Sequence, residues 1–310
     1  MHPQAQRVLV VGSIGIDTVE TPFGKATDVL GGSATYASAA ASYFAPVDMV
    51  AAVGEDFDLR QFSFLQARGV NLEGLEVVKG GKTFRWGGKY HFDLNTRDTL
   101  FTDLNVLGTF DPKLPAATRG SPYVLLGNMH PLVQAKVLDQ MAARPKFVVG
   151  DTMNLWINIA RKELEAILGR LDCLIINDSE ARELSGSHNL IKAAANIRRL
   201  GPKTLVIKKG EHGALLFHGN DVFSAPAFPL EDVFDPTGAG DAFAGGFLGH
   251  LAAKDRVDTA ALRQAVVWGS ALASFCVERF SVEGLREVPP KALSARYAAF
   301  KDLAHFEAEA

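Results

Sequence analysis

The chain has 310 residues, and 47% of them are hydrophobic, which is enough for the core of one large α/β domain or of two ordinary ones. Its formal net charge is −3, and it has no long run of basic residues. Because nucleic acids and acidic membranes attract basic surfaces, neither is expected as a partner.

The cysteine content and the first residues indicate the compartment. The two cysteines, Cys173 and Cys276, both lie in apolar runs. We therefore expect buried free thiols rather than a disulfide, which fits a reducing compartment such as the cytoplasm. Residues 1–7 are short and polar, and the apolar run after them leads into a glycine turn, so we expect no signal peptide. Every apolar stretch long enough to span a membrane contains a charge, so no membrane span is expected.

The first seventy residues predict the start of an α/β fold. Apolar, β-branched runs indicate core strands, and Gly31-Gly32 opens an alanine-rich helix. The turn Pro22-Phe23-Gly24 separates two short strands. The expected elements are a strand at 7–11, two strands within 16–30, a helix at 33–44, a strand at 47–53 and a helix ending near 68.

Residues 83–95 alternate between apolar and polar side chains. The apolar ones stand at even positions, and only Gly87-Gly88 interrupts the pattern. A period of two predicts a strand or hairpin with one apolar face, which must cover another part of the molecule. Together with residues 16–30, this segment predicts a small second sheet.

From residue 122 onwards, strands and helices alternate. This order predicts a parallel sheet with helices on both faces, whose ligands bind at the carboxyl ends of the strands. Strands are expected at 123–126, 147–150, 173–177 and 204–208, and helices near 131–143, 161–170, 179–185 and 189–200. A hairpin at 214–224 and helices at 259–279 and 290–306 follow. Polar residues gather at the strand ends: Asn128, Asp151, Asn154, Asn177, Glu180 and Lys209.

The segment 235–247, DPTGAGDAFAGGF, combines a glycine-rich turn, a carboxylate and an apolar helix. Gly238 and Gly240 allow a sharp turn, and Phe243 and Phe247 are spaced as on a buried helical face. Unpaired amides at a helix start, at the positive end of its dipole, favour an anion. Asp241 lies at the same end and is a candidate base. An anion cradle beside a base suits phosphoryl transfer.

This segment resembles the second signature of the ribokinase family, also called the PfkB carbohydrate kinases. Supporting motifs extend the resemblance from about residue 7 to about residue 285. The family phosphorylates hydroxyls of sugars, sugar phosphates and nucleosides, normally from ATP. The resemblance implies one ribokinase-like domain over 1–310, a three-layer α/β/α fold with a mostly parallel sheet. It also implies a small β-sheet lid formed by about 16–30 and 75–105, through which family members often pair as dimers.

The resemblance also implies catalytic and acceptor residues. Asp241 is expected to be the base, and Gly238, Ala239 and Gly240 the anion-binding turn. On the acceptor side, the family's G-x-x-x-x-D pattern places its hydroxyl-binding aspartate at Asp17. Its G-G-x-x-x-N pattern matches Gly31 and Gly32, but Tyr36 stands where the asparagine would be. Arg97, in the expected lid, is a candidate for a substrate anion.

The cofactors implied are ATP and Mg²⁺, with a monovalent cation such as K⁺ in some members. Residues 177–180 match the family's N-x-x-E motif, in which Asn177 and Glu180 organise Mg²⁺ largely through water. The same residues could instead form a helix cap at Asp178 or Ser179. Asp235 and the loop 281–284 are candidates for the monovalent cation. The expected nucleotide contacts are Asn177, Lys209, Gly210, Gly213, Thr237, Gly238, Gly240 and Ser270.

The sequence leaves the acceptor open among a sugar, a cyclitol and a nucleoside. A nucleoside kinase is the first alternative, because the aromatic residues of the expected lid could stack on a base. A nicotinamide-dependent oxidoreductase is the second, suggested by VVGSIG at 10–15, although the third glycine of the dinucleotide motif is missing. A sugar-binding regulator without catalysis is the third, and the presence of Asp241 and Glu180 argues against it.

Overall fold

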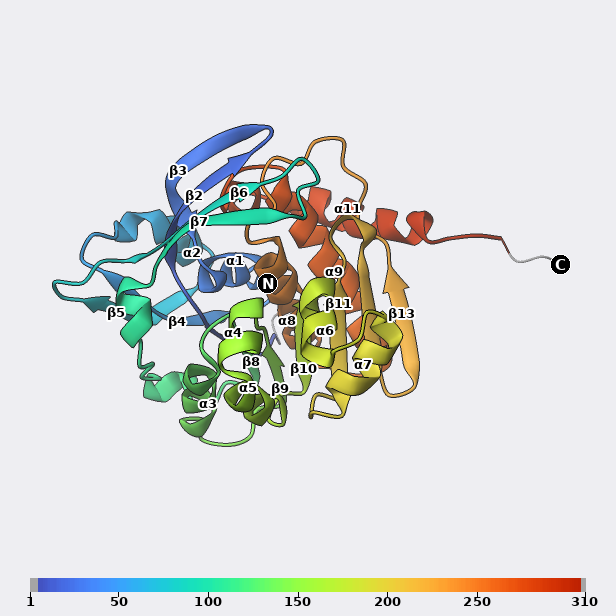
Figure 1. Ribbon diagram of the computed structural model, residues 1–310, viewed down its shortest axis with the longest axis horizontal. Helices are drawn as coiled ribbons and strands as arrows, with labels where there is room; N and C mark the ends of the chain where they lie inside the picture. The colour runs from blue at the N-terminus through green and yellow to red at the C-terminus, as the bar shows by residue number, and fades with distance from the viewer. Residues whose placement is uncertain (1–4, 308–310) are drawn as a thin grey trace.

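Two β-sheets organise the protein in this computed structural model, which describes residues 5–307 (Figure 1). The large sheet has nine strands in the spatial order β13 (Asp221–Ala225), β12 (Ala214–His218), β11 (Thr204–Lys208), β10 (Cys173–Asn177), β9 (Phe147–Gly150), β8 (Tyr123–Leu126), β1 (Val8–Val11), β4 (Val47–Gly54) and β5 (Asn71–Val78). The small sheet has four strands in the order β3 (Gly24–Gly31), β2 (Gly15–Thr21), β6 (Phe84–Tyr90) and β7 (Arg97–Asp103). We call the small sheet the lid.

The central strands of the large sheet are buried on both faces. Every neighbouring pair from β5 to β11 is parallel, and β12 and β13 add an antiparallel hairpin. In β1, Val8 and Val10 belong to one hydrophobic core, and Leu9 and Val11 to the other. Strands with two buried faces have continuous apolar sequences, which explains why the sequence pattern located these strands.

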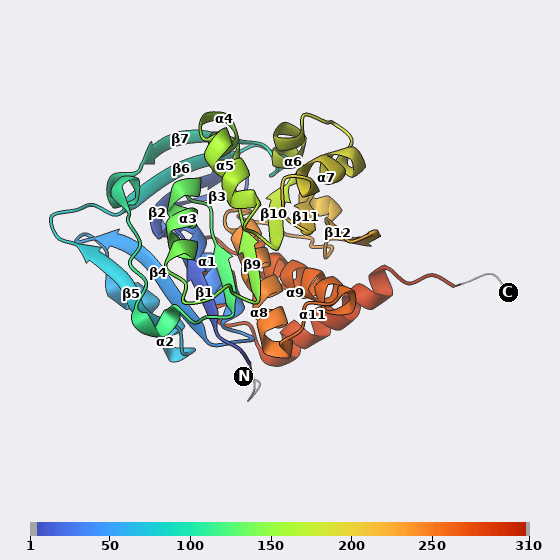
Figure 2. The same cartoon turned by 90° about the horizontal axis from the view of Figure 1, so that it is seen from below.

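Helices cover both faces of this sheet. They are α1 (Ser33–Ala41), α2 (Ser63–Ala67), α3 (Pro131–Asp139), α4 (Asn154–Ile159), α5 (Arg161–Leu168), α6 (Asp178–Ser185), α7 (Leu190–Arg198), α8 (Ala239–Lys254), α9 (Thr259–Val277), α10 (Glu283–Arg286) and α11 (Pro290–Leu303). Buried residues of α1, α8 and α9 belong to one core, and those of α3, α5, α6 and α7 to the other. Figure 2 shows the sheet between these two layers. The expected three-layer α/β/α fold with a small lid sheet is confirmed.

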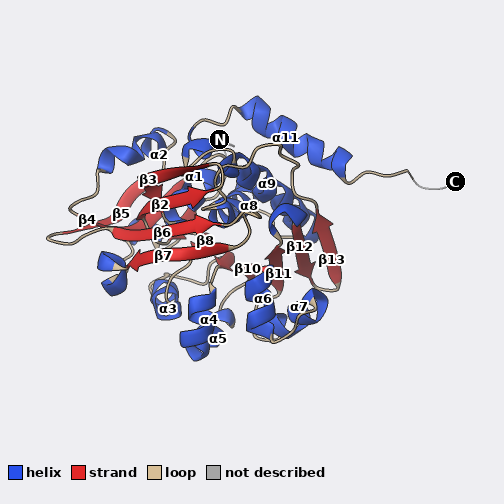
Figure 3. Cartoon of the chain, turned by 45° about the horizontal axis from the view of Figure 1, so that its top comes forward, coloured by secondary structure: helices blue, strands red, loops and turns tan. Residues whose placement is uncertain are grey.

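The lid differs in extent from the expected ranges. Residues 75–78 belong to β5, at the edge of the large sheet, and the second half of the lid is the β6–β7 hairpin. Phe92 has an even number and was therefore expected on the apolar face of this segment. In the structure it lies outside both β6 and β7 and is 85% exposed. A bulge occurs at Gly87-Gly88, where a side chain on Gly88 would collide with the ring of Trp86. Figure 3 shows the four lid strands lying across the large sheet.

The helix after the glycine-rich turn lies in the core. Phe243, Phe247 and Leu251 of α8 are buried, as their spacing predicts. Within residues 5–307, one helix, α9, has the length and mean hydropathy (1.3) to cross a membrane. However, 56% of that window is buried inside the protein, and α9 contributes to the same core as α8, which is typical of a core helix. Residues 1–4 and 308–310 of the expected domain range lie outside the described residues.

Candidate active site

The turn before α8 lies beside the end of β11. Gly238 has φ = 75°, a left-handed conformation that glycine adopts without strain, and α8 begins at the next residue. A Cβ built on Gly240 would lie only 2.6 Å from the Nζ atom of Lys208, so the turn touches the last residue of β11. Residues 236–241 are all partly exposed, so a ligand can reach the turn.

Two of the three amides predicted to bind an anion are free to do so. Among the residues that the structure describes, the N–H groups of Gly238 and Gly240 have no acceptor. The N–H of Ala239 instead donates to the carbonyl oxygen of Pro236 at 3.3 Å. Amides at a helix N-terminus bind anions through their hydrogens and the helix dipole, so Gly238 and Gly240 carry that capacity here.

Asp241, at the start of α8, lies among other charged groups. Burial, together with the charges of Asp151 and Glu180, raises its pKa to about 7 against the opposing charges of Lys208 and Arg97. Burial and Asp151 likewise raise the pKa of Glu180 to about 7. Three carboxylates, one directly after β9 and the others on α6 and α8, therefore share one region, and Asp241 has a pKa suited to exchanging protons near neutrality.

Lys208 and Asp151 also belong to this site. Asp151 was expected among the polar residues at the strand ends but was given no role, and Lys208 was not singled out. Burial raises the pKa of Asp151, and the charge of Lys208 opposes that rise. Strand alternation explains the position of Lys208: Val206 faces the core formed with α8, and a residue two positions later points to the same side. The predicted nucleotide contact, Lys209, is the next residue. Its N–H donates to the carbonyl oxygen of Gly213 at 2.7 Å and so closes the loop after β11.

Asp17, which is expected to bind the acceptor, is a buried carboxylate. It lies on β2, is 4% exposed, and its Oδ1 atom has no hydrogen-bond partner among the described residues. Burial, together with the charges of Asp235 and Asp241, raises its pKa to about 8. A Cβ on Gly31 would lie 1.9 Å from the Asp17 Oδ2 atom, so only glycine leaves room for this carboxylate. The structure therefore brings together Asp17 and Gly31, both of which were expected on the acceptor side.

Tyr36 joins the acceptor side to the anion turn. It is fully buried on α1, and a Cβ on Gly238 would lie 2.4 Å from atoms of its ring. Glycine is required at 238 both by this contact and by the positive φ. Gly32 opens α1 with φ = 94°, and a side chain there would collide with the backbone at Ser13. The aromatic ring that replaces the family's asparagine thus supports the signature turn.

The lid contacts the site at three places. The Thr237 hydroxyl donates to the Tyr90 hydroxyl on β6 at 3.2 Å. Arg97 on β7 stacks over the Trp86 ring at 5.7 Å, and its charge lowers the pKa of both Asp241 and Glu180. The Oδ1 atom of Asn95, in the turn between β6 and β7, lies 2.3 Å from the position of a Cβ on Gly210. The lid therefore covers both the signature turn and the loop after β11.

Asn177 and Glu180 form a capping box at the start of α6. The Oδ1 atom of Asn177 accepts from the N–H of Glu180, and the Oε2 atom of Glu180 accepts from the N–H of Asn177, both at 2.8 Å. The cap residue is therefore Asn177, and the expectation of a cap at Asp178 or Ser179 is wrong. The reciprocal bonds fix the Glu180 carboxylate, which is 7% exposed, beside Asp151 and Asp241.

The remaining predicted contacts lie in packed surroundings. A Cβ on Gly213 would meet the carbonyl oxygen of Ala225, so this glycine packs against β13. Ser270 is buried on α9, and a Cβ on its neighbour Gly269 would meet the Phe243 backbone of α8 at 2.7 Å. The small residues of α9 thus allow close helix packing, and a nucleotide contact at Ser270 stays a prediction.

Asp235 ties the signature turn to the loop after α9. It is fully buried, and burial raises its pKa. Its two carboxylate oxygens accept from the N–H of Thr237 at 2.8 Å and from that of Ser281 at 2.9 Å. Ser281 has a positive φ of 59°. This carboxylate therefore holds the two loops named as the candidate monovalent-cation site.

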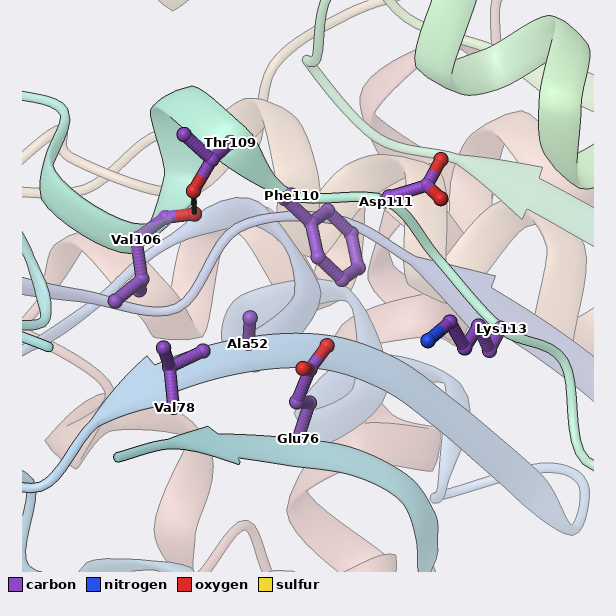
Figure 4. A pocket seen from close by; sticks show the side chains of 8 residues that line it. All are labelled: Ala52, Glu76, Val78, Val106, Thr109, Phe110, Asp111 and Lys113. Atoms are coloured by element: carbon purple, nitrogen blue, oxygen red, sulfur yellow. Dashed lines mark hydrogen bonds between the residues drawn. The ribbon is translucent and has the colours of Figure 1, made fainter. Parts of the chain in front are cut away.

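Two hollows lie away from these residues. One, of about 150 Å³, lies on the large sheet beside β4 and β5 (Figure 4); it is lined by Ala52, Glu76, Val78, Val106, Thr109, Phe110, Asp111 and Lys113. The other, of about 610 Å³, lies between α8, α9 and α11, with Trp268 and Tyr297 in its wall. Neither contains a predicted site residue.

Comparisons with known proteins agree with this geometry. A model of the pfkB family carbohydrate kinases matches residues 5–287. The chain is 29% identical over 246 residues to the cytidine kinase of Thermococcus kodakarensis, covering 78% of this chain and 87% of that protein. It is 27% identical over 239 residues to the 2-dehydro-3-deoxygluconokinase of Thermoproteus tenax, covering 71% and 72%. Arabidopsis thaliana ribokinase, solved with ribose and ATP, has the same fold, with a TM-score of 0.75 at 21% identity over 94% of this chain and 99% of that one.

The family match spans almost the whole described chain, and the signature turn, the capping box and the lid lie within it. It excludes the oxidoreductase alternative. The chain therefore belongs to the pfkB family of carbohydrate kinases, with a ribokinase-like fold, and is an ATP-binding phosphotransferase whose acceptor is an alcohol group.

Proposed function

We propose that this kinase transfers the γ-phosphoryl group of ATP to a hydroxyl of a small carbohydrate, with Asp241 as the base. The observation that carries the proposal is the position of Asp241. It lies at the start of α8 beside free amides, and its charge raises the pKa of Asp17. A base, an anion cradle and a hydroxyl anchor thus come together from distant parts of the chain.

The chemistry divides among these residues. The Asp17 carboxylate accepts hydrogen bonds from acceptor hydroxyls, which supply the partner that its Oδ1 atom lacks. Asp241 takes the proton of the attacking hydroxyl, and its raised pKa keeps it an effective acceptor near neutral pH. The amides of Gly238 and Gly240 stabilise the charge that develops on the transferred phosphoryl oxygens. The lid excludes water through its contacts at Thr237 and Gly210.

The donor set fits Mg²⁺. Within residues 5–307, no three His, Cys, Asp or Glu side chains form a metal cage. Mg²⁺ needs no such cage, because it keeps several waters and takes one or two carboxylates with substrate phosphates. The charge of Asp151 raises the pKa of Glu180, and a nearby cation would lower it again. Glu180, whose carboxylate is held by Asn177, would order the hydrated ion. When bound, the ion would neutralise phosphate charge.

A nucleoside acceptor is the second candidate. One relative, matched over 87% of its length, is a cytidine kinase. Another, from Methanothermobacter thermautotrophicus, is a nucleoside kinase that is 26% identical to this chain. On the acceptor side, Tyr36 and Tyr90 are buried close to Asp17, whose charge acts on both. Aromatic rings beside a hydroxyl anchor suit a base joined to a ribose.

One experiment tests the proposal and separates the candidates. ATP consumption is measured with sugars, sugar acids, polyols, cyclitols and nucleosides at matched concentrations. Acceptor-dependent ADP release with a neutral sugar or polyol supports the first candidate, and release with nucleosides alone supports the second. Tight acceptor binding without ADP release would instead favour a regulator without catalysis.

Three further properties belong to the proposal. A monovalent cation such as K⁺ binds near Asp235 and residues 281–284, so activity should depend on K⁺ at constant ionic strength.

The location is cytoplasmic, supported by two buried, free cysteines. The chain forms a homodimer through the lid, supported by β7, an edge strand whose seven residues are all exposed. A monomeric mass by light scattering would contradict the dimer.

A further inference from the structure

The larger of the two hollows, of about 610 Å³, has a wall of aromatic rings, and we call it the aromatic hollow. Trp268 of α9 and Tyr297 of α11 stack there, with ring centroids 4.0 Å apart and planes 11° apart. Phe44, which follows α1, packs edge-on against Trp268 at 5.2 Å, and the His250 ring of α8 lies 5.9 Å from the same indole. Figure 2 shows α9 and α11 side by side, on the opposite side of the sheet from α3 and α5.

Contacts outside the aromatic hollow hold part of this wall in place. Tyr43 also lines the hollow, and its hydroxyl donates to the carbonyl oxygen of Leu285 at 2.7 Å and accepts from the N–H of Val288 at 2.9 Å. The guanidinium of Arg68 lies over the Tyr43 ring at 4.4 Å. A wall that is already fixed loses little conformational entropy when a ligand binds, so this arrangement favours binding.

The size and the exposed rings of the aromatic hollow suit a small organic molecule. Its volume lies within the range of about 300–1,000 Å³ typical of small-molecule sites, and an apolar cavity of roughly 150 Å³ can already hold benzene. Tyr43, Phe44, Trp268 and Tyr297 are all partly exposed. Aromatic rings gathered in one concavity gain stacking and edge contacts when another planar ring covers them.

A positive charge lies at the rim of the aromatic hollow. Lys254, the last residue of α8, is exposed, and its ammonium forms no ion pair and no hydrogen bond with any residue from 5 to 307. Gln264 and Ser294 add uncharged polar groups, and no acidic residue of the described chain lines the hollow. A negative group near Lys254 would therefore meet an unpaired positive charge without repulsion from a carboxylate.

The aromatic hollow lies at the opposite end of α8 from the candidate base. Asp241 is in the first turn of this helix, and Lys254 ends it thirteen residues later. At the helical rise of about 1.5 Å per residue, the two positions are about 20 Å apart. A molecule in the hollow therefore does not touch the reacting atoms of the proposed transfer.

We propose that the aromatic hollow is a second binding site, which takes a planar aromatic molecule that bears an anionic group such as a carboxylate. The ring packs against the aromatic wall, and the anionic group accepts hydrogen bonds from the Lys254 ammonium. This site is independent of the proposed function, because none of its residues takes part in phosphoryl transfer.

The probe is 2-naphthoate, a planar ring with one carboxylate, titrated into the full chain by calorimetry. Two matched compounds separate its contacts: 2-naphthamide keeps the ring without the charge, and decahydro-2-naphthoate keeps the charge without a planar ring. We expect 2-naphthoate to bind and both matched compounds to bind more weakly. A saturating non-hydrolysable ATP analogue should leave the affinity for 2-naphthoate unchanged, because the analogue binds elsewhere.

Substitutions at exposed positions test the location of the probe. Ser294→Trp fills the hollow, whereas Ala295→Trp adds the same ring at the next position of α11, which does not line it. We expect 2-naphthoate to bind at least about tenfold more weakly to Ser294→Trp, whereas Ala295→Trp should stay within about twofold of wild type. Lys254→Gln should weaken binding of 2-naphthoate about two- to fivefold, the usual effect of losing an exposed ion pair, and leave 2-naphthamide unaffected. Lys301→Gln, in the last turn of α11, is its control.

Several results would overturn the inference. These are no binding of 2-naphthoate, equal weakening by Ala295→Trp and Ser294→Trp, or displacement by the ATP analogue, which would locate the probe in the active site. Equally tight binding of decahydro-2-naphthoate would remove the preference for a planar ring, and an unchanged affinity in Lys254→Gln would remove the anionic contact. A change from dimer to monomer in Ser294→Trp, measured by light scattering, would show that a second copy of the chain covers the hollow instead.

Discussion

Replacing Asp17 with asparagine should stabilise the ligand-free protein at alkaline pH while impairing catalysis. Burial raises the pKa of the Asp17 carboxyl from 3.8 to about 8. The native state therefore holds this proton more tightly than the unfolded state does. As pH rises from about 4 to about 8, the unfolded state ionises and the native state does not, so this group progressively lowers the free energy of unfolding.

The size of the effect follows from that difference. About four pH units at 1.36 kcal/mol each amount to about 6 kcal/mol once the pH exceeds both pKa values. Between pH 5.5 and pH 8.5, the part that develops is about 3 kcal/mol. Asparagine has the same shape and no ionisation, so the gain of Asp17→Asn over wild type should grow by about that amount across this interval.

The assay is urea unfolding at pH 5.5 and pH 8.5 without nucleotide or acceptor. The control is Asp103→Asn, at an exposed position on β7, whose effect should stay within about 0.5 kcal/mol at both pH values. A stability difference between Asp17→Asn and wild type that does not change with pH would refute the claim that the buried carboxyl is neutral in the free protein. The same variant should lose acceptor affinity, because the carboxyl group proposed to bind the acceptor hydroxyls has been replaced.

Three other predictions concern the site. Asp241→Asn should lower kcat at least about a hundredfold with intact folding, because a general base contributes about 10²–10⁴-fold. In wild type, kcat/KM should fall as the pH drops through about 7, where Asp241 becomes protonated; wild-type turnover by the variant would remove Asp241 from the base role. Glu180→Gln should raise the Mg²⁺ concentration needed for half-maximal rate, and an unchanged Mg²⁺ titration would contradict the assignment. Tyr36→Ala should lower the free energy of unfolding by about 3–5 kcal/mol in urea unfolding, because the buried ring of Tyr36 supports Gly238. Tyr36→Phe should lower it far less. Equal losses of stability in the two variants would show that the hydroxyl matters more than the ring.

Local patterns predicted most of the fold. Apolar runs located the central strands, because both faces of the sheet are buried, and four-residue spacing located the buried face of α8 at Phe243 and Phe247. Two strands, β5 and β7, were not predicted, because they are not buried on both faces. The edge strand β5 is only partly buried, and every residue of β7 is exposed, so neither needs a regular apolar pattern.

The chemistry of the site was predicted only as far as contiguous motifs reach. The signature turn, the N-x-x-E segment and Asp17 could be recognised because each is a local pattern. The choice of Lys208 over Lys209 depends on which side of β11 faces α8, and the support of Gly238 by Tyr36 joins residues about two hundred positions apart. Alternation and turn chemistry act between neighbouring residues and are therefore visible in the order of amino acids. Contacts between distant segments, and the proton affinities that they produce, exist only after helices and sheets have packed, because burial and neighbouring charge arise from that packing.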